Sequence, residues 1–192
     1  MGAPGRLTAH SIAAAALTVA ESGPLTMRAV AQALGCDPMA LYRHFPNRAA
    51  LVDALTDLAL ADVEVPTEGR WDDRIVELHA RVRTAVLRRP GLAAEYVARP
   101  PLGEHAGRVT KALALALREV GASKRQIVGA LEVLQGYLGA NIVQAVAPQD
   151  QERRAAEVGE ALGPAAARHL LVNGSEELLR FGVRLIARGA VT

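Results

Sequence analysis

Apolar residues recur every three or four positions from the start of the chain, a spacing that predicts helices rather than strands. The apolar stripe of the first predicted helix consists of Ile12, Ala16, Leu17 and Ala20. Thr8 or Ser11 is suited to cap the beginning of this helix, and the Ser-Gly-Pro sequence at 22–24 ends it. We therefore expect one amphipathic helix before residue 22.

A short second helix is predicted over residues 27–34. Thr26 is a suitable N-cap, because its hydroxyl can accept a hydrogen bond from a free amide of the first turn. Gly35 follows the helix at the position where a left-handed residue commonly closes the last turn. Both ends of this helix are therefore marked in the sequence.

A third, equally short helix is predicted directly after a turn of a few residues. Asp37 is a good N-cap and Pro38 is favoured at the first helical position. The helix is expected to end near His44 or Phe45, because Pro46 cannot continue it.

A fourth helix is expected to begin after Asn47, and its apolar stripe consists of Leu51, Leu55, Leu58 and Val63. The segment 65–69 then breaks the helical pattern. We place a domain boundary here: a first domain over 1–48, extended by a connecting helix over 47–64, and a second domain over 65–192.

The second domain is predicted to be helical throughout. Its expected helices, separated by Gly and Pro, cover 71–89, 92–98, 104–120, 124–146, 165–172 and 175–188. No internal repeat and no alternating strand pattern is present in the sequence. The predicted fold class is therefore all-α, with an N-terminal three-helix unit and a C-terminal helical domain.

Composition adds limits to this prediction. The chain has 192 residues, 51% of them hydrophobic and only 3% aromatic, and a net charge of +2. No uninterrupted apolar run is long enough to span a membrane, so we expect a soluble, cytoplasmic protein. Cys36 is the only cysteine, which excludes an intramolecular disulfide, and we expect it to be a small buried residue.

The helices over 27–34 and 38–44 are separated by Gly35-Cys36-Asp37, which is the spacing of a helix-turn-helix. The residues expected to be buried in this unit are Val30, Ala31, Leu34, Leu41 and Phe45. The residues expected to contact DNA are Thr26, Arg28, Pro38, Met39, Tyr42, Arg43, His44 and Arg48. Two short capped helices also occur in many other all-α proteins, so spacing alone leaves DNA binding open.

Each proposed DNA contact has a chemical reason. The guanidinium of Arg28 can donate two hydrogen bonds to O6 and N7 of guanine. Tyr42 and His44 carry polar tips suited to phosphate oxygens. Arg48 would stand in the first turn of the next helix, where free amides already favour an anion.

The segment 25–51 resembles the corresponding segment of TetR-type transcriptional repressors. The most specific parts of the resemblance are Leu41-Tyr42-Arg43-His44-Phe45 and Asn47-Arg48-x-x-Leu51, where the family commonly has Lys at the position of Arg48. The resemblance implies a homodimer in which two DNA-binding units are joined to larger helical domains. Those domains dimerise and bind a small molecule.

The second half is similar to the branch of the family that contains the tetracycline repressor, through Trp71, Arg89-Pro90-Gly91 and the sequence 136–139. Its pocket chemistry differs. In that repressor the corresponding helix carries polar side chains that bind the drug and the metal, whereas this chain has Leu78 and Val82 there. Glu64 stands where the repressor has a histidine at the end of the fourth helix. We therefore expect neither tetracycline nor a metal, and no cofactor.

Many apolar side chains and few polar ones fall between residues 71 and 146, which predicts a cavity of roughly 300 to 1,000 Å³ for a largely hydrophobic effector. The candidate effector-binding residues are Leu78, Val82, Tyr96, Arg99, His105, Val109, Leu113, Tyr137 and Asn141. The candidate dimer-interface residues are Leu131, Leu134 and Leu138, or their neighbours one helical face around, in one helix, and Leu178, Phe181 and Leu185 in another.

The function predicted on this basis is a ligand-responsive repressor, binding a palindromic operator as a homodimer. The alternative is a helical protein that binds small molecules or partner proteins without specific DNA contact. An enzyme is not expected, because the chain has no phosphate-binding glycine loop, nucleophile elbow or paired-carboxylate motif.

Overall fold

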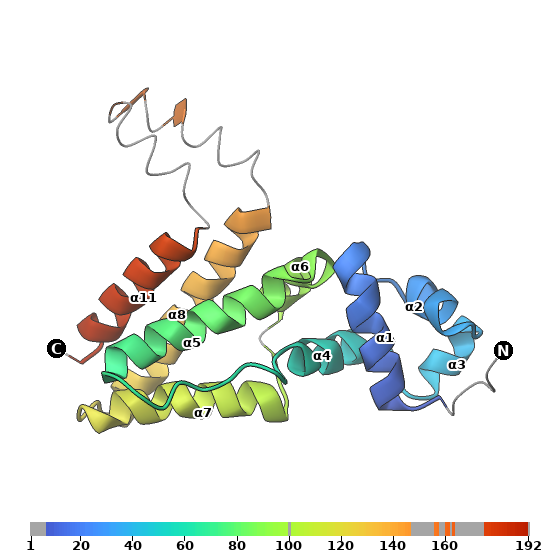
Figure 1. Ribbon diagram of the computed structural model, residues 1–192, viewed down its shortest axis with the longest axis horizontal. Helices are drawn as coiled ribbons and strands as arrows, with labels where there is room; N and C mark the ends of the chain where they lie inside the picture. Colours follow the sequence, from blue (N-terminus) through green and yellow to red (C-terminus); the bar gives the residue numbers. More distant parts are fainter. Residues whose placement is uncertain are drawn as a thin grey trace. The chain divides into compact units, whose positions relative to one another are not determined.

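The computed structural model describes residues 7–99, 101–146, 156–157, 160–161, 163 and 175–191 (Figure 1). The regular structure of these residues is entirely helical, as predicted, with no strand in the described ranges. The helices agree with the predicted ranges within a few residues at most ends, while the helix predicted over 165–172 lies outside the described residues.

The described residues form two compact units. The first contains residues of Met1–Asp62 and Ala85–Gly107, and the second contains residues of Val63–Thr84 and Arg108–Thr192. The first unit also includes a segment from the middle of the chain, which the predicted division at residues 64 and 65 assigns to the second domain. That division remains a prediction.

The first unit contains helices α1 (Ala9–Ser22), α2 (Met27–Leu34), α3 (Pro38–Tyr42), α4 (Arg48–Ala59) and α6 (Pro90–Ala98). The starts of α1 to α4 are capped by side chains. In α1 both candidate caps are used, because Thr8 is the N-cap and Ser11 returns a hydrogen bond to it as a capping box. Asn47 caps α4 by accepting a hydrogen bond from the amide of Ala50 at 2.9 Å.

Two helices are shorter than their apolar stripes predict. The amides of His44 and Phe45 both bond to the carbonyl of Leu41 in a tightened turn, so α3 ends at Tyr42. The restriction that Pro46 places on Phe45 explains the early end. Helix α4 ends at Ala59 in a similar turn, and Val63, although buried, lies beyond it.

The core of the first unit joins α1, α2, α3, α4 and α6. Its fully buried side chains include Ile12, Val30, Leu41, Leu51, Leu55 and Leu92. The predicted core residues Ala31 and Phe45 are also buried, whereas Leu34 and Cys36 are half-buried at its edge. Cys36, which we expect to be buried, is thus only partly buried where it packs against this core in the turn between α2 and α3.

Helix α6 packs closely on the end of α1. A Cβ atom at Gly91 would overlap the carbonyl oxygen of Gly23 and lie 3.1 Å from that of Ala20. Pro90 occupies the first turn of α6, and Arg89 pairs with Glu21 of α1 at 3.7 Å. The Arg-Pro-Gly sequence therefore starts α6 and fastens it to α1.

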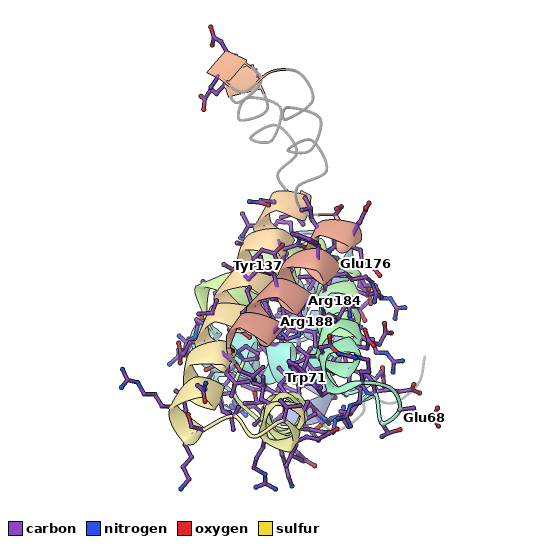
Figure 2. The ribbon with its side chains drawn as sticks, turned by 90° about the vertical axis from the view of Figure 1, so that its left-hand side faces the viewer. Glu68, Trp71, Tyr137, Glu176, Arg184 and Arg188 are labelled. Atoms are coloured by element: carbon purple, nitrogen blue, oxygen red, sulfur yellow. The ribbon has the colours of Figure 1, made fainter. Side chains whose placement is uncertain are left out.

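The second unit contains most of α5 (Trp71–Leu87) and α7 (Glu104–Glu119), together with α8 (Lys124–Val146) and α11 (Glu176–Gly189). Helices α8 and α11 lie side by side (Figures 1 and 2). The Tyr137 hydroxyl of α8 donates to the Leu178 carbonyl of α11 at 2.7 Å. Gly182 lies against the Tyr137 ring, where a Cβ atom would overlap the phenol.

Charged residues attach α11 to the first turn of α5. The Asp72 carboxylate is fully buried and accepts hydrogen bonds from Arg188 at 2.7 Å and from Arg70 at 3.1 Å. Arg184 pairs with the neighbouring Asp73 at 2.5 Å. Figure 2 places Arg184 and Arg188 on the side of α11 that faces the start of α5 at Trp71. Burial raises the pKa of Asp72, but the hydrogen bonds and charges of Arg188 and Arg70 outweigh it and hold the pKa at about 2.

Candidate DNA-binding face and effector pocket

The turn between α2 and α3 has the geometry expected of a helix-turn-helix. Gly35 adopts the left-handed conformation with φ of 64°, and its amide bonds back to the last turn of α2. The amide of Cys36 bonds to the carbonyl of Ala31 at 3.0 Å. The Asp37 carboxylate then accepts a hydrogen bond from the amide of Met39 at 2.7 Å and starts α3. These bonds fix the direction in which α3 leaves the turn.

Seven of the eight candidate DNA contacts are exposed, and five of them lie around this turn: Arg28, Met39, Tyr42, Arg43 and His44. Met39 is 68% exposed. The side chains of Arg28, Arg43 and His44 make no hydrogen bond or ion pair with any other residue in the described part of the chain. Their polar groups are therefore available to another molecule.

Two further candidates have a structural role at the helix starts. The Thr26 hydroxyl accepts a hydrogen bond from the amide of Ala29 at 3.1 Å, which leaves its own proton to donate. Pro38 is half-buried at the first position of α3. Both residues help to start the helices α2 and α3, and neither carries a charge.

Arg48 differs from the other candidates because its charge is matched within the protein. It donates to both carboxylate oxygens of Glu95 on α6, at 2.6 and 3.1 Å, and to the carbonyl of Leu25 at 3.1 Å. The hydrogen bonds that Arg48 donates to Glu95 raise the pKa of Arg48. Arg48 thus pairs at the junction of α4 and α6 although its side chain is 46% exposed, and we expect this pairing to reduce its contribution to a phosphate contact.

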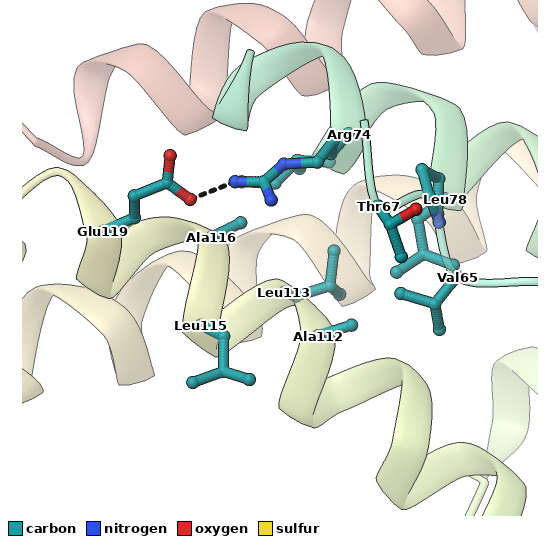
Figure 3. Close-up of a pocket in the computed structure, with 11 residues that line it drawn as sticks. Val65, Thr67, Arg74, Leu78, Ala112, Leu113, Leu115, Ala116 and Glu119 are labelled. Carbon is teal, nitrogen blue, oxygen red and sulfur yellow. Dashed lines mark hydrogen bonds and ion pairs between the residues drawn. The ribbon is translucent and has the colours of Figure 1, made fainter. Parts of the chain in front are cut away.

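A pocket of about 250 Å³ lies in the second unit, between α5, α7 and the segment 65–67 (Figure 3). Its lining residues are Val65, Pro66, Thr67, Arg74, Ile75, Leu78, Ala112, Leu113, Leu115, Ala116 and Glu119. All but three of these side chains are apolar. The volume lies slightly below the usual range for small-molecule sites.

Two of the three polar side chains of the pocket, Arg74 and Glu119, meet at one end, while Thr67 lies near Leu78. Figure 3 shows an ion pair between Arg74 and Glu119 there, with Val65 and Leu78 at the opposite end. The Nε atom of Arg74 is buried and has no hydrogen-bond acceptor among the described residues. A buried donor without an acceptor costs about 1 to 3 kcal/mol.

Only two of the nine effector candidates, Leu78 and Leu113, line this pocket. Val82 and Val109 are buried in the second unit without bordering it. His105 lines a different cavity of about 270 Å³ in the first unit, together with His10 and Asp57.

The remaining effector candidates hold helices in place. Tyr96 is buried in α6, and Arg99 pairs with Asp53 of α4 at 3.1 Å. Tyr137 joins α8 to α11, and Asn141 accepts a hydrogen bond from Arg83 at 2.8 Å while donating to the carbonyl of Ser175 at 3.1 Å. Tyr137 and Asn141 thus bridge helices and do not line the pocket between α5 and α7.

The predicted dimer residues divide into two groups. Leu134 and Leu138 are buried inside one chain, so they belong to its own core and not to an interface. Leu131 and Leu178 are half-buried, whereas Phe181 and Leu185 of α11 are 67% and 64% exposed. The neighbouring face of α8, which the sequence leaves open as the alternative, is the exposed one.

Two negative observations concern the described residues. No three His, Cys, Asp or Glu side chains among them lie together in an arrangement that could hold a metal ion. Within the same ranges, no helix combines the length and apolar character needed to cross a bilayer.

A capped helix-turn-helix and a second helical unit with an apolar pocket are typical of a bacterial transcription regulator. Two family models match the chain: "Bacterial regulatory proteins, tetR family" over residues 12–55 and "Tetracyclin repressor-like, C-terminal domain" over residues 65–173. The chain therefore belongs to the tetR family of bacterial regulatory proteins. This family consists of regulators rather than enzymes.

A curated relative is similar over most of the chain. It is the HTH-type transcriptional repressor DrrR1 of Streptomyces coeruleorubidus, which is 30% identical over 155 residues. The alignment covers 77% of this chain but only 57% of that repressor, so this chain spans little more than half the relative's length.

Solved structures share the fold. Apo ActR from Streptomyces coelicolor has a TM-score of 0.81 at 24% identity, covering 100% of this chain and 97% of ActR. A TetR-type transcriptional regulator from the same organism has a TM-score of 0.71 at 25% identity, covering 96% and 98% of the two chains. ActR is also known in complex with actinorhodin. The predicted fold class and family are thus confirmed.

Proposed function

We propose that this protein is a transcriptional repressor that binds a palindromic operator as a homodimer and is released by a small, largely hydrophobic effector. The observation that carries the proposal is the face formed by α2 and α3. Its basic and aromatic side chains are exposed, and Arg28, Arg43 and His44 have no partner within the described chain. The alternative, a helical binding protein without specific DNA contact, is not favoured for a member of a family of DNA-binding regulators.

Helix α3 enters the major groove in this proposal, and the start of α2 approaches the phosphate backbone. Arg28 reads a guanine edge through a two-point hydrogen bond. Tyr42, Arg43 and His44 contact phosphates, which fix the register of the protein on the duplex. Met39 supplies an apolar contact in the groove, which suits a thymine methyl group.

The homodimer is formed through α8 and α11. Exposed small or apolar residues recur along one side of α8 at spacings of four and three residues: Gly129, Val133, Gly136, Ala140 and Val143. No atom would contact a Cβ at Gly129 or Gly136 within the described chain, so another helix can approach closely there. With Phe181 and Leu185 of α11, this stripe supports a four-helix bundle between two copies.

The effector occupies the pocket between α5 and α7. Its apolar lining favours a ligand bound mainly by burial of apolar surface and oriented by one or two polar contacts. Binding there selects dimers in which the two DNA-binding units no longer fit successive major grooves. The proposal includes no metal and no cofactor, and it places the protein in the cytoplasm, where bacterial operators lie.

Selection of duplexes from a random pool tests this proposal. Several rounds of binding to the full chain, followed by sequencing, should enrich an inverted repeat whose half-sites are related by two-fold symmetry. Enrichment of no sequence, or of a single asymmetric half-site, would contradict a dimeric operator-binding protein. An Arg28→Ala variant run in parallel should enrich a repeat with one degenerate base pair in each half-site.

A further inference from the structure

Arg74 brings several hydrogen-bond donors to one end of the apolar pocket. Its Nη2 donates to Glu119, while its buried Nε has no acceptor among the described residues. In a guanidinium, Nε and Nη2 point from the same edge and together match the two oxygens of a carboxylate. Glu119 therefore uses one of the two donors of this edge.

We propose that the pocket binds amphipathic carboxylates, with the apolar part between α5 and α7 and the carboxylate on the Nε and Nη2 edge of Arg74. This inference rests on the proposed effector pocket and names the chemical class of the effector. The ligand carboxylate accepts from both donors and takes the place of Glu119.

The lining of the pocket explains why a single charged group is expected. Apart from Arg74 and Glu119, only Thr67 contributes a polar side chain. The walls are apolar and come from both helices: Ile75, Leu78, Ala112, Leu113 and Ala116. A ligand with polar groups spread over its surface would leave them without partners against these walls, whereas a ligand with one anionic end would not.

Glu119 can be displaced at small cost. Its side chain is 56% exposed, so it gains water when it leaves Arg74. An ion pair between partly exposed side chains contributes little to stability. A ligand carboxylate that also satisfies the buried Nε makes one hydrogen bond more than Glu119 does.

The test compares two probes of equal size, 1-naphthoate and 1-naphthamide, by isothermal titration calorimetry on the full chain. The carboxylate should bind about tenfold more tightly than the amide, the effect of one charge-assisted hydrogen bond. Arg74→Met should reduce this ratio to near one. Arg81→Met is the matched control, because Arg81 lines a neighbouring polar cavity and not this pocket, and it should keep the ratio of the unmodified protein.

A second variant keeps the test informative if Arg74→Met fails to fold. Glu119→Gln removes the competing carboxylate at an exposed position, so it should tighten 1-naphthoate and leave 1-naphthamide unchanged. Equal affinity of the two probes for the unmodified protein, or binding of neither, would overturn the carboxylate site. A preference for 1-naphthoate over 1-naphthamide that persists in Arg74→Met would also overturn the carboxylate site. By contrast, 1-naphthoate that binds through Arg74 without releasing the selected duplex would count against the proposed effector role and leave the carboxylate site standing.

Discussion

Arg48 of α4 and Glu95 of α6 form a two-point ion pair, with Nη2 to Oε1 and Nη1 to Oε2 distances of 2.6 and 3.1 Å. The same guanidinium also bonds to the carbonyl of Leu25, just before α2. Arg48 thereby ties three segments of the first unit together. Its positive charge is paired with Glu95, whereas the exposed side chain of Arg43 at the end of α3 has no ion-pair partner among the described residues.

The two arginines should therefore differ in their effect on DNA binding. Arg43→Gln removes a phosphate contact and should lower the slope of log affinity against log salt by about 1, the value for one phosphate contact. Arg48→Gln should leave the slope nearly unchanged. Fluorescence anisotropy with a labelled duplex at four or five salt concentrations measures both slopes. An equal loss of slope in the two variants would return Arg48 to the phosphate contacts.

Arg28 and Tyr42 should separate base recognition from phosphate contact. Arg28→Ala should weaken binding to the selected operator by about 1 to 3 kcal/mol and relax the preference at one base pair. Tyr42→Phe should weaken operator and random duplex alike, because it removes only a hydroxyl that contacts phosphate. Competition between the two duplexes gives the comparison. An Arg28→Ala variant that loses equal affinity for both has lost no base contact.

The dimer should depend on the exposed apolar residues of α11. Leu185→Asp should give folded monomers, because it places a charge in the proposed interface while the protomer core is unchanged. Leu102→Asp is the control: Leu102 is 72% exposed but lies outside α8 and α11, so the dimer should persist. Sedimentation velocity distinguishes the two states. Leu134→Asp should instead unfold the chain, because Leu134 is buried in the protomer core.

His79 should make the second unit sensitive to mild acid. The imidazole is buried in α5, where Nδ1 lies 2.8 Å from the Ile75 carbonyl, and burial lowers its pKa below 6.5. In the unfolded chain His79 binds a proton near pH 6.5, whereas in the folded chain it binds one only at lower pH. The free energy of unfolding is therefore highest above pH 6.5 and decreases as the pH falls below it. Between pH 7.5 and 5.5 the unmodified protein should lose about 1 kcal/mol more than His79→Gln. Urea unfolding at the two pH values measures this difference, and equal losses would mean that His79 titrates normally.

The first unit was predictable because its signals are local. Thr26, Gly35, Asp37 and Asn47 act on amides within a few residues of themselves, so the sequence marks each helix end directly. The exposure of Arg43 followed from the same reasoning. The pairing of Arg48 with Glu95, 47 residues away, could not be predicted, since no local pattern encodes it.

The second unit was predictable only at the level of its helices. Tyr137 and Asn141 are polar residues in an apolar helix, a pattern that suits a ligand pocket as well as a contact between helices. Their partners lie 41 and 34 residues further along the chain. The exposed stripe of α8 could have been found from its spacing, but its glycines made the buried leucine side look like the stronger interface signal.

The central claim is that a dimer of this chain recognises a specific inverted repeat through α2 and α3. Its most direct test is the ratio of affinities for the selected repeat and for a scrambled duplex of the same composition, measured with the unmodified dimer near physiological salt. We predict a ratio of about 10³ or more, with an affinity for the repeat that falls steeply as salt rises. A ratio near one would contradict the claim.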